Sequence, residues 1–515
     1  MPRLIIICIG LFLSAMLKMQ VNAAEKINIA ISAAPNSLVP FFSTDANSQN
    51  INRLIHKSLI DFNQKMQFRC IACKSFEEKV VGNKQILKFK LRDDLVFSDG
   101  TPVTAEDVKR SWYYYAKDEK IKSTFIGMFE AIEAINILDK YSLEIVFSSF
   151  SLENVSNLGL LKIVKLKKTN NEQLEPADVI GCGDYVLSSI KPLEIVVTPR
   201  DSSKVTFVFK VVKDETTLAL KLINKEIDLS VANMSPRKVY WLKSKSDILK
   251  VWDIPSGNYL FMGLNHKKEI FHDIRMRKAI SLLIPRQDLL KYKLKDTAVL
   301  SVGMFSPAFA DIYEPRPVDS FSPEEARKLL SELGYKKNKK GFLAKDGVEL
   351  ELDWKVSNNK ASIEIVEVMQ HFLEKEGFKI NVSIQEWGTF MSAFKGGNFD
   401  IVISQWIGFT GPDMLSFVFH SKNTPPKGGN RTSYKNLAFD KVLDLATVET
   451  NSEKRLKLYK QAADIENSDY AYINLWHPNV IWVGSNCLKN LELDPTGGFY
   501  PLLKLEKSHE GHCGK

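Results

Sequence analysis

The cysteines and histidines are the side chains of this sequence that could do redox or metal chemistry. Cys70 and Cys73 have a spacing that can close into a disulfide, act as a redox pair or supply half of a metal site. No second pair with this spacing exists and no helical pattern follows, so we expect this pair to close on itself. Cys487 and Cys513 could form a bridge that holds the C-terminal tail, although the sequence alone leaves the pairing open.

The histidines could serve as ligands of a metal or a haem. His272 and His420 stand alone in the sequence, and a lone histidine is more often a surface or hydrogen-bonded group. His509, His512 and Cys513 are close enough in sequence to hold a metal ion, but they belong to the last residues, where a mobile tail is expected. We therefore predict no metal site.

Motifs of catalysis are not found in the sequence. The chain carries no Gly-x-Ser-x-Gly nucleophile elbow, no His-Glu-x-x-His motif and no phosphate-binding P-loop. No paired carboxylates or activated nucleophile stand out either. We predict that the protein is not an enzyme and has no catalytic residues and no cofactor.

Length, composition and charge narrow the classes of fold and partner. The chain has 515 residues, too many for one simple core, and 44% of them are hydrophobic and 25% charged. The net charge is +9, but most Lys and Arg residues are interspersed with Asp and Glu. No basic patch with interleaved aromatic residues is found, so a nucleic-acid partner is not expected.

The first 23 residues differ from the rest of the chain. Arg3 precedes an apolar run over residues 4–17, and small residues at 21–24 suit signal peptidase. We predict a signal peptide over 1–23 and a periplasmic protein, without a lipid anchor because no cysteine stands at the cut site. Cys8 leaves with this segment, so five of the six cysteines remain and at least one is unpaired.

Any site must be positioned by the α/β elements that the sequence predicts. Residues 87–92 alternate apolar and charged side chains, which predicts a half-buried strand, and a turn at 98–100 leads into a helix. Thr104 can cap this helix, with Asp107 as the second half of a capping box. The pattern predicts further strands at 26–32, 142–147, 193–197, 205–212, 259–265, 349–355, 379–384 and 399–406, helices at 47–59, 214–223, 322–334, 361–377, 387–395 and 452–467, and irregular structure at 62–84.

Several separated stretches resemble one protein family. Residues 91–112, LRDDLVFSDGTPVTAEDVKRSW, resemble the signature of the extracellular solute-binding proteins of the peptide and nickel class. Further matches follow in the order that this class has: 181–185, 261–265 with 271–279, 322–335, 385–387, 397–400 and Trp406. The resemblance covers nearly all of residues 24–505.

The resemblance implies an α/β, two-lobed periplasmic binding protein fold, type II-like and of the large peptide-binder class, with a ligand cleft between the lobes. Lobe I would comprise 24–257, with an extra subdomain at roughly 62–180. Lobe II would comprise 258–477, and 478–515 would return to lobe I. The resemblance further implies a monomer that captures a peptide or peptide-like small molecule by hinge closure and delivers it to the permease subunits of an ABC importer.

The resemblance also points to a ligand site. In the peptide binders of this class, an Asp three positions after the strand-end Trp pairs with the amino terminus of the peptide, but here Phe409 follows Trp406 at that distance. The strand before Trp406 also lacks the Arg with which oligopeptide binders meet a ligand carboxylate. These departures weaken the standard peptide interpretation and leave an aromatic cleft. The predicted ligand-binding residues are Trp387, Trp406, Phe409, Asp413, Asn47 and Tyr259.

Alternatives stay open for these residues and for the function. Each Trp could belong to the core of a lobe, and Asp413 and Asn47 could be helix caps. The protein could instead be a sensory or cell-wall-fragment binding protein on the same fold. It could also bind a non-peptide ligand such as an oligosaccharide or a metal chelate.

Overall fold

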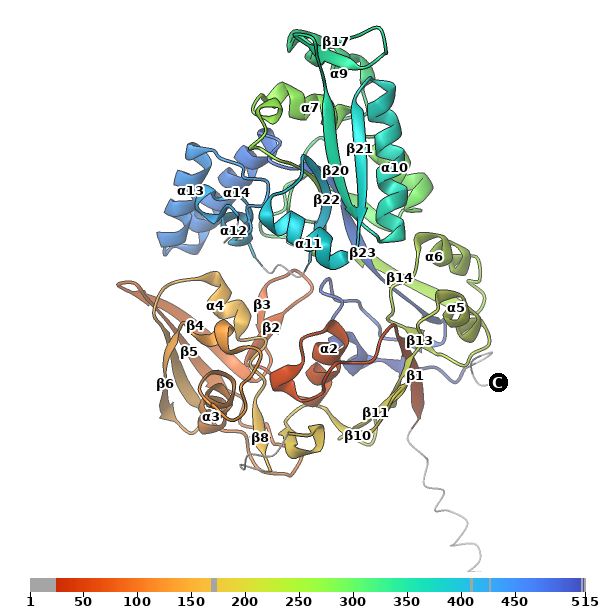
Figure 1. The fold of residues 1–515 in the computed structure, drawn as a ribbon. Helices are drawn as coiled ribbons and strands as arrows, with labels where there is room; N and C mark the ends of the chain where they lie inside the picture. The colour runs from red at the N-terminus through yellow and green to blue at the C-terminus, as the bar shows by residue number, and fades with distance from the viewer. Residues whose placement is uncertain (1–24, 168–173, 408–410, 426–427, 511–512, 514–515) are drawn as a thin grey trace, which may run out of the picture.

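The computed structural model describes residues 25–167, 174–407, 411–425, 428–510 and 513. Within these ranges the chain forms two α/β lobes, one above the other in Figure 1. One sheet of twelve strands runs through both lobes in the order β10-β11-β12-β1-β13-β23-β15-β22-β20-β21, with β14 and β16 pairing with β23 beside this path. The predicted signal peptide and Phe409 lie outside the described residues.

The lower lobe is built on β1 (Lys26–Ile31), which pairs in parallel with β12 (Thr206–Val211) and β13 (Leu229–Ser230). Ile27, Ile29 and Ile31 of β1 are fully buried. The other elements of this part are β10 (Tyr185–Lys191), β11 (Glu194–Pro199), β14 (Leu249–Pro255), α2 (Ala46–Ile55), α5 (Glu215–Ile223), α6 (Pro236–Lys243), β24 (Leu488–Lys489), η7 (Tyr500–Lys504) and β25 (Glu506–Lys507).

A second sheet in the lower lobe has the order β4-β5-β7-β6. Its strands are β4 (Cys73–Val81), β5 (Lys84–Leu91), β6 (Ile132–Asp139) and β7 (Ser142–Phe147). The apolar side chains of β5 share one core with Val108, Trp112 and Tyr115 of α3 (Ala105–Ala116). Around this sheet lie η1 (Pro40–Phe42), β2 (Ile60–Phe62), β3 (Phe68–Cys70), η2 (Ile126–Phe129), α4 (Leu152–Asn157), β8 (Val164–Leu166), η3 (Pro176–Asp178) and β9 (Val179–Gly181).

The upper lobe packs helices against β15 (Tyr259–Leu264), β20 (Glu351–Ser357), β21 (Lys379–Gln385) and β22 (Ile401–Trp406) (Figure 1). Its long helices are α7 (Ile274–Leu282), α9 (Pro323–Glu332), α10 (Lys360–Lys375), α11 (Trp387–Gly396), α13 (Leu437–Val448) and α14 (Ser452–Ser468). The shorter elements are η4 (Glu269–Phe271), α8 (Arg286–Asp288), η5 (Leu289–Lys293), β16 (Ala298–Leu300), β17 (Lys336–Lys337), β18 (Leu343–Lys345), β19 (Val348–Glu349), α12 (Met414–Phe419) and η6 (Ser421–Asn423).

Two connections join the lobes. The long strand β23 (Ile473–Ser485) pairs first with β15 and β16 and then with β14 and β13, so it passes from one lobe into the other. The second connection is the short segment 256–258 between β14 and β15. The lobe bounds at 257 and 478, and the subdomain at 62–180, stay predictions.

Two local predictions are wrong. The stretch 62–84 contains β3 and β4 rather than irregular structure. Because β4 is an edge strand with most of its side chains exposed, it lacks the apolar alternation that would have indicated a strand. The predicted helix at 47–59 ends at Ile55, because His56 takes an extended backbone, with φ −127° and ψ 143°.

The structure shows the pairing of the cysteines, which the sequence alone left open. Cys70 is bonded to Cys73, and Cys487 is bonded to Cys513. Cys182 is a free, buried thiol. None of the helices in the described ranges combines the length and the apolar character that a membrane crossing requires.

Candidate functional site

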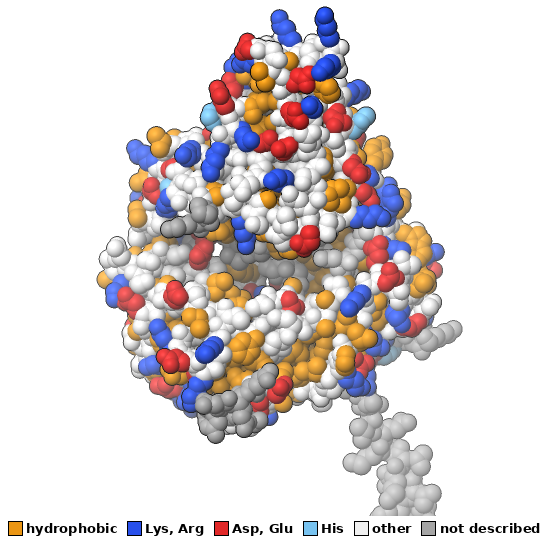
Figure 2. All heavy atoms as spheres, viewed as in Figure 1, with side chains coloured by type: hydrophobic (Ala, Val, Ile, Leu, Met, Phe, Trp, Pro, Cys, Tyr) orange, Lys and Arg blue, Asp and Glu red, His pale blue; other side chains and the backbone are white. Residues whose placement is uncertain are grey.

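A hollow separates the two lobes on the face shown in Figure 2. On the upper side it is bordered by α11, by the end of β22 and by α12, and on the lower side by the β2–β3 hairpin (Figure 1). Trp406, the last residue of β22, pairs with Tyr259, the first residue of β15, just after the connection 256–258. In open α/β sheets, ligands bind outside the carboxyl ends of the strands, as at the end of β22.

The lobes touch each other through the turn of the β2–β3 hairpin. Gln67 Nε2 donates to both carboxylate oxygens of Asp311, each at 3.0 Å. Met66, in the same turn, belongs to an apolar cluster with Phe305 and Phe309 of the upper lobe. A lower-lobe hairpin is thus anchored in the upper lobe.

A second contact between the lobes involves Arg455 of α14. Its guanidinium lies 3.9 Å from a carboxylate oxygen of Glu78 on β4. Its Cζ also lies 4.8 Å from the centre of the Phe150 ring, a cation–π contact. A cation of the upper lobe therefore meets an anion and an aromatic ring of the lower one.

A cavity of about 330 Å³ lies between these two contacts. The hairpin contributes Lys65 and Met66, and the upper lobe contributes Phe309, Asp311, Ile312, Gly411, Pro412, Ser452, Glu453, Arg455, Leu456 and Tyr459. The volume lies in the range of small-molecule pockets, and its lining combines apolar side chains with a few charged ones. Such a lining suits an apolar side chain of a ligand whose polar groups reach the rim.

Asp413 follows the two cavity residues Gly411 and Pro412. It occupies the N-cap position of α12, but its side chain makes no capping hydrogen bond. Its Oδ1 is buried and has no hydrogen-bond partner among the described residues. Burial, together with the charge of Glu153 from the lower lobe, raises the pKa of Asp413 from 3.8 to about 6.

Trp406 and Arg431 form a stacked pair at the end of β22. The Cζ of Arg431 lies 4.7 Å from the centre of the Trp406 ring and 4.5 Å from that of Phe394 on α11. Trp406 is 9% exposed and stacks on Phe261 with 6.4 Å between ring centres. It thus has one side in the core of the upper lobe and another against the guanidinium. No motif or periodicity marks Arg431 in the sequence.

The remaining predicted site residues lie in different surroundings. Trp387 begins α11 and is 58% exposed, so it is free to meet a ligand. Asn47 lies in the first turn of α2 and donates to the carbonyl of Ala33 at 2.8 Å, while the cap of that helix is Asp45. Tyr259 is fully buried and donates its hydroxyl to Asn474, so it presents no surface to a ligand in this conformation.

The side chains of His420 and His509 have ordinary protein partners. His420 Nε2 lies 3.2 Å from Asp444, and its Nδ1 accepts from the backbone N–H of Lys422. His509 Nε2 lies 3.3 Å from Glu25. Across the described ranges no group of three or more His, Cys, Asp or Glu side chains could hold a metal ion. His512 lies outside those ranges.

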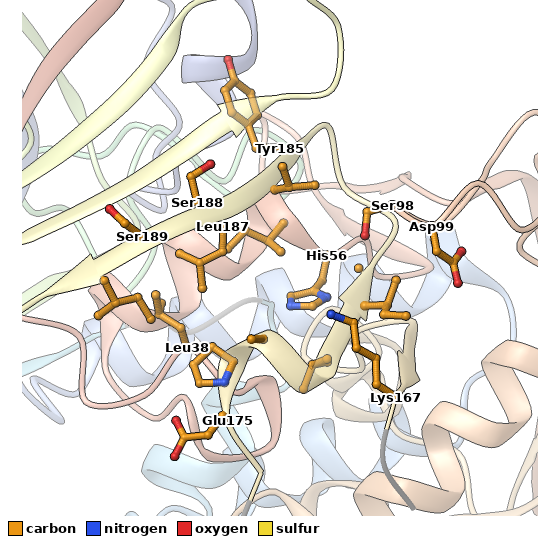
Figure 3. A pocket seen from close by; sticks show the side chains of 18 residues that line it. Leu38, His56, Ser98, Asp99, Lys167, Glu175, Tyr185, Leu187, Ser188 and Ser189 are labelled. Carbon is orange, nitrogen blue, oxygen red and sulfur yellow. The ribbon is translucent and has the colours of Figure 1, made fainter.

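A larger cavity, of about 540 Å³, lies wholly within the lower lobe (Figure 3). Leu38, Leu187 and Tyr185 line it together with the polar side chains of His56 and Lys167. His56 is buried, and its Nδ1 has no hydrogen-bond partner among the residues that the structure describes. Burial beside Lys162 lowers the pKa of His56 to about 3. This cavity does not adjoin the upper lobe, so it is separate from the cleft.

A family model for bacterial extracellular solute-binding proteins, family 5 (Middle), matches residues 74–427, more than half of the chain. The chain belongs to this family. The match extends from β4 through α12 and η6, so it includes Trp387, Trp406 and Asp413 but not the hairpin turn at Met66 or the helix α14. Family membership confirms the resemblance that the sequence motifs indicated.

Individual family relatives cover most of the chain. The periplasmic murein peptide-binding protein MppA of Escherichia coli strain K12 is 26% identical over 481 residues, covering 86% of each chain. The oligopeptide-binding protein AppA of Bacillus subtilis strain 168 is 24% identical over 496 residues, covering 91% of this chain and 89% of AppA. Their names describe binding proteins and not enzymes.

The fold of the family is also found in solved structures. NikA of Brucella suis, in complex with Fe(III)-EDTA, matches with a TM-score of 0.80 and 19% sequence identity over 94% of this chain and 100% of NikA. At that identity the likeness concerns the fold, and it confirms the predicted two-lobed α/β architecture. The comparisons do not favour the alternative of a sensory protein.

Proposed function

We propose that the protein is the solute-binding subunit of an ABC importer, which captures a peptide or peptide-like small molecule between its lobes. The observation that carries the proposal is the cavity between the β2–β3 hairpin and the upper lobe, which is lined in part by Gly411 and Pro412 from the loop that follows β22. MppA and AppA, named for peptides, supply the class of ligand. The proposed ligand contacts are Trp387, Trp406, Asp413 and Asn47, with Phe409 in the segment that follows Trp406.

The mechanism we propose is thermodynamic. A ligand that touches both lobes stabilises the closed form by its difference in affinity for the closed and open forms. The two connections, the short segment 256–258 and the single strand β23, are suited to a hinge because few residues need to change their backbone angles. The permease subunits would recognise the closed form, and no bond of the ligand would be broken. We further propose that the mature protein is a periplasmic monomer, produced by removal of residues 1–23.

Within the cleft, Asp413 is suited to the amino group of a peptide. Its buried Oδ1 has no partner among the described residues, and a charge-assisted hydrogen bond from an ammonium would satisfy it. The apolar lining around Met66, Phe309 and Tyr459 is suited to a ligand side chain. The exposed Trp387 ring could cover the other side of the ligand.

The experiment has two parts. Native mass spectrometry of the purified mature chain should identify a small molecule that co-purifies in the cleft. Small-angle scattering, with and without an added tripeptide library, should show a smaller radius of gyration in its presence, accompanied by a change in tryptophan fluorescence. A protein that carries no small molecule, and neither contracts nor changes its fluorescence with peptides, would contradict the proposal. Turnover of any added peptide would contradict the view that the protein only binds.

A further inference from the structure

Among the residues that the structure describes, the side chain of Arg431 has no polar partner. Its Nε is buried and unpartnered, and the side chain forms neither a hydrogen bond nor an ion pair with any residue that the structure describes. Its contacts are instead with the Phe394 and Trp406 rings. A ring face attracts the charge of a guanidinium, but it leaves the in-plane N–H donors free.

Other buried or half-buried arginines are partnered through oxygen atoms. Arg53 donates to the Asp61 carboxylate at 3.1 Å. Arg277 and Arg286 donate to backbone carbonyl oxygens at 2.6 and 2.7 Å. Arg431 is half-buried, and its buried Nε has no acceptor among the described residues, which is costly for a donor of a charged group. This exception favours an acceptor from outside the chain.

The neighbouring segments supply no counter-charge. Residues 408–410 are Gly, Phe and Thr, and residues 426–427 are Pro and Lys, so neither segment contains a carboxylate. The pKa of Arg431 is consistent with the lack of a counter-charge. Burial lowers this pKa, and the group that opposes the shift is the phenol of Tyr472. A guanidinium without an anion thus lies in an aromatic environment.

The guanidinium of Arg431 lies at the end of the sheet that faces the other lobe, because it reaches the Trp406 ring, while the Arg431 backbone packs beside Gly397, before the start of β22. Its ring partner Trp406 ends β22 and pairs with Tyr259, next to the connection between the lobes. The chain then runs on to Gly411 and Pro412, which line the cavity against the hairpin of the lower lobe. A ligand in the cleft would therefore lie within reach of this end of the upper lobe.

We propose that Arg431 receives a free carboxylate of the bound ligand and so selects peptides that have an unblocked carboxyl terminus. The inference rests on the proposed function and deepens it. The planar fork of a guanidinium binds a carboxylate through two parallel hydrogen bonds, and the aromatic rings hold the fork in place. Arg431 would supply the positive charge that the strand 400–405 lacks, from a loop that follows α12.

The test compares one tripeptide library in two forms, as free acids and as carboxyl-terminal amides, with Fe(III)-EDTA as a carboxylate that is not a peptide. Native mass spectrometry finds the members that bind, and isothermal titration gives their Kd for the wild type, Arg431→Gln and Arg431→Lys. We expect the wild type to bind free acids and to bind the matching amides about 10- to 100-fold more weakly, the range for a charge-assisted hydrogen bond. Arg431→Gln should lose affinity for free acids by a similar factor. Arg431→Lys should retain part of it, since the charge stays and the fork is lost.

The matched control is Arg275→Gln. Arg275 is an exposed arginine whose guanidinium lies 2.7 Å from Asp273, and its replacement should leave every Kd unchanged. Thermal unfolding of each variant checks that it folds. If Arg431→Gln does not fold, the contrast between acids and amides in the wild type and the Kd values of Arg431→Lys decide the question.

The other outcomes separate this inference from the proposed function. Equal affinity for acids and amides, or an Arg431→Gln variant that binds like the wild type, overturns the role of Arg431 and leaves peptide capture standing. Binding of Fe(III)-EDTA but of no tripeptide, with a loss in Arg431→Gln, overturns peptide capture and leaves the carboxylate role standing. A wild type that binds none of the three probes overturns both.

Discussion

The helix starts of α3 and α12 use an acidic side chain in opposite ways. At α3, Asp107 accepts from the backbone N–H of Thr104 at 2.9 Å, and the two residues complete a capping box. At α12, Asp413 stands at the N-cap position, leaves the helix uncapped and keeps a buried oxygen that has no partner in the described part of the chain. The first carboxylate stabilises a local turn, whereas the second is held at the edge of the cleft.

The same contrast extends to the regions around the two helices. The strand and helix of the family signature bury their apolar side chains in one core within the lower lobe. The wall of the cleft from Trp406 to Arg431 keeps a carboxylate and a guanidinium that do not pair with each other. Unpartnered buried polar groups lower stability. Such groups also occur on α3, where the Trp112 Nε1 and the Tyr115 hydroxyl are buried without a partner among the described residues. The cleft wall differs because its unpartnered groups are a carboxylate and a guanidinium, which can take a charge and so can meet a charged ligand.

The largest effect is expected in the signature core. Phe89 is fully buried on β5 and stacks on Phe76 with 5.5 Å between ring centres. Phe89→Ala should lower the free energy of unfolding by about 3–5 kcal/mol, because it removes a large apolar side chain and leaves a cavity. Urea unfolding measures this loss. The ligand affinity of the folded fraction should be unchanged, and a parallel loss of affinity would show that the two regions are not independent.

The next effect concerns the pH dependence of Asp413. Because its pKa is raised from 3.8 to about 6, the folded state holds the proton more firmly than the unfolded chain. This contribution to stability is fully present below about pH 4 and is lost as the pH rises through 6, by up to about 3 kcal/mol. Urea unfolding from pH 4 to 7 should show that Asp413→Asn removes this dependence.

Glu153→Gln is the matched variant for that prediction. The charge of Glu153 is the second cause of the raised pKa of Asp413, after burial. Removing this charge should shift the loss of stability to lower pH without abolishing it. If neither variant changes the pH dependence of the free energy of unfolding, Asp413 is solvated in the folded protein and its pKa is not raised by burial.

The difference between the regions also explains what could be predicted from the sequence. The strand at 84–91, the cap at Thr104 and the buried face of α3 follow from neighbouring residues through alternation, capping and helical spacing. The family motifs extended this to the two lobes and to Trp406. Phe409 lies outside the described residues, and the predicted site as a whole stays untested.

The parts that could not be predicted depend on residues far apart in the chain. Arg431 is brought to Trp406 and Phe394 by the packing of a loop against two other elements, and no local pattern encodes that approach. The hairpin contact of Gln67 with Asp311 spans the two lobes in the same way. For Tyr259 the sequence allowed two places, because an aromatic residue at the start of a strand can lie in the cleft or in the core. The structure buries it in the core.

A smaller effect is expected at the cap of α3. Thr104→Ala removes the side chain of the capping box but leaves the buried face of the helix intact. The free energy of unfolding should fall by about 1 kcal/mol, the usual value for an N-cap. Chemical unfolding beside Asp413→Asn at neutral pH tests the contrast directly, because the Asn variant should lose no stability. A loss of the same size in both would mean that Asp413 supports its helix after all.

The smallest effect is expected at the contact between the lobes. Glu78 lies 3.9 Å from Arg455 across the cleft, and its side chain is 29% exposed, so the pair is worth less than about 1 kcal/mol. Glu78→Gln should shift the unliganded protein modestly toward the open form and weaken ligand binding less than about fivefold. Scattering without ligand and titration with ligand measure the two effects. The neighbouring exposed Glu77→Gln is the control, since Glu77 makes no such pair in the described residues. A large loss of affinity in Glu78→Gln alone would show that Glu78 takes part in ligand binding. The lower lobe would then contribute more to the ligand site than a contact that holds the lobes together.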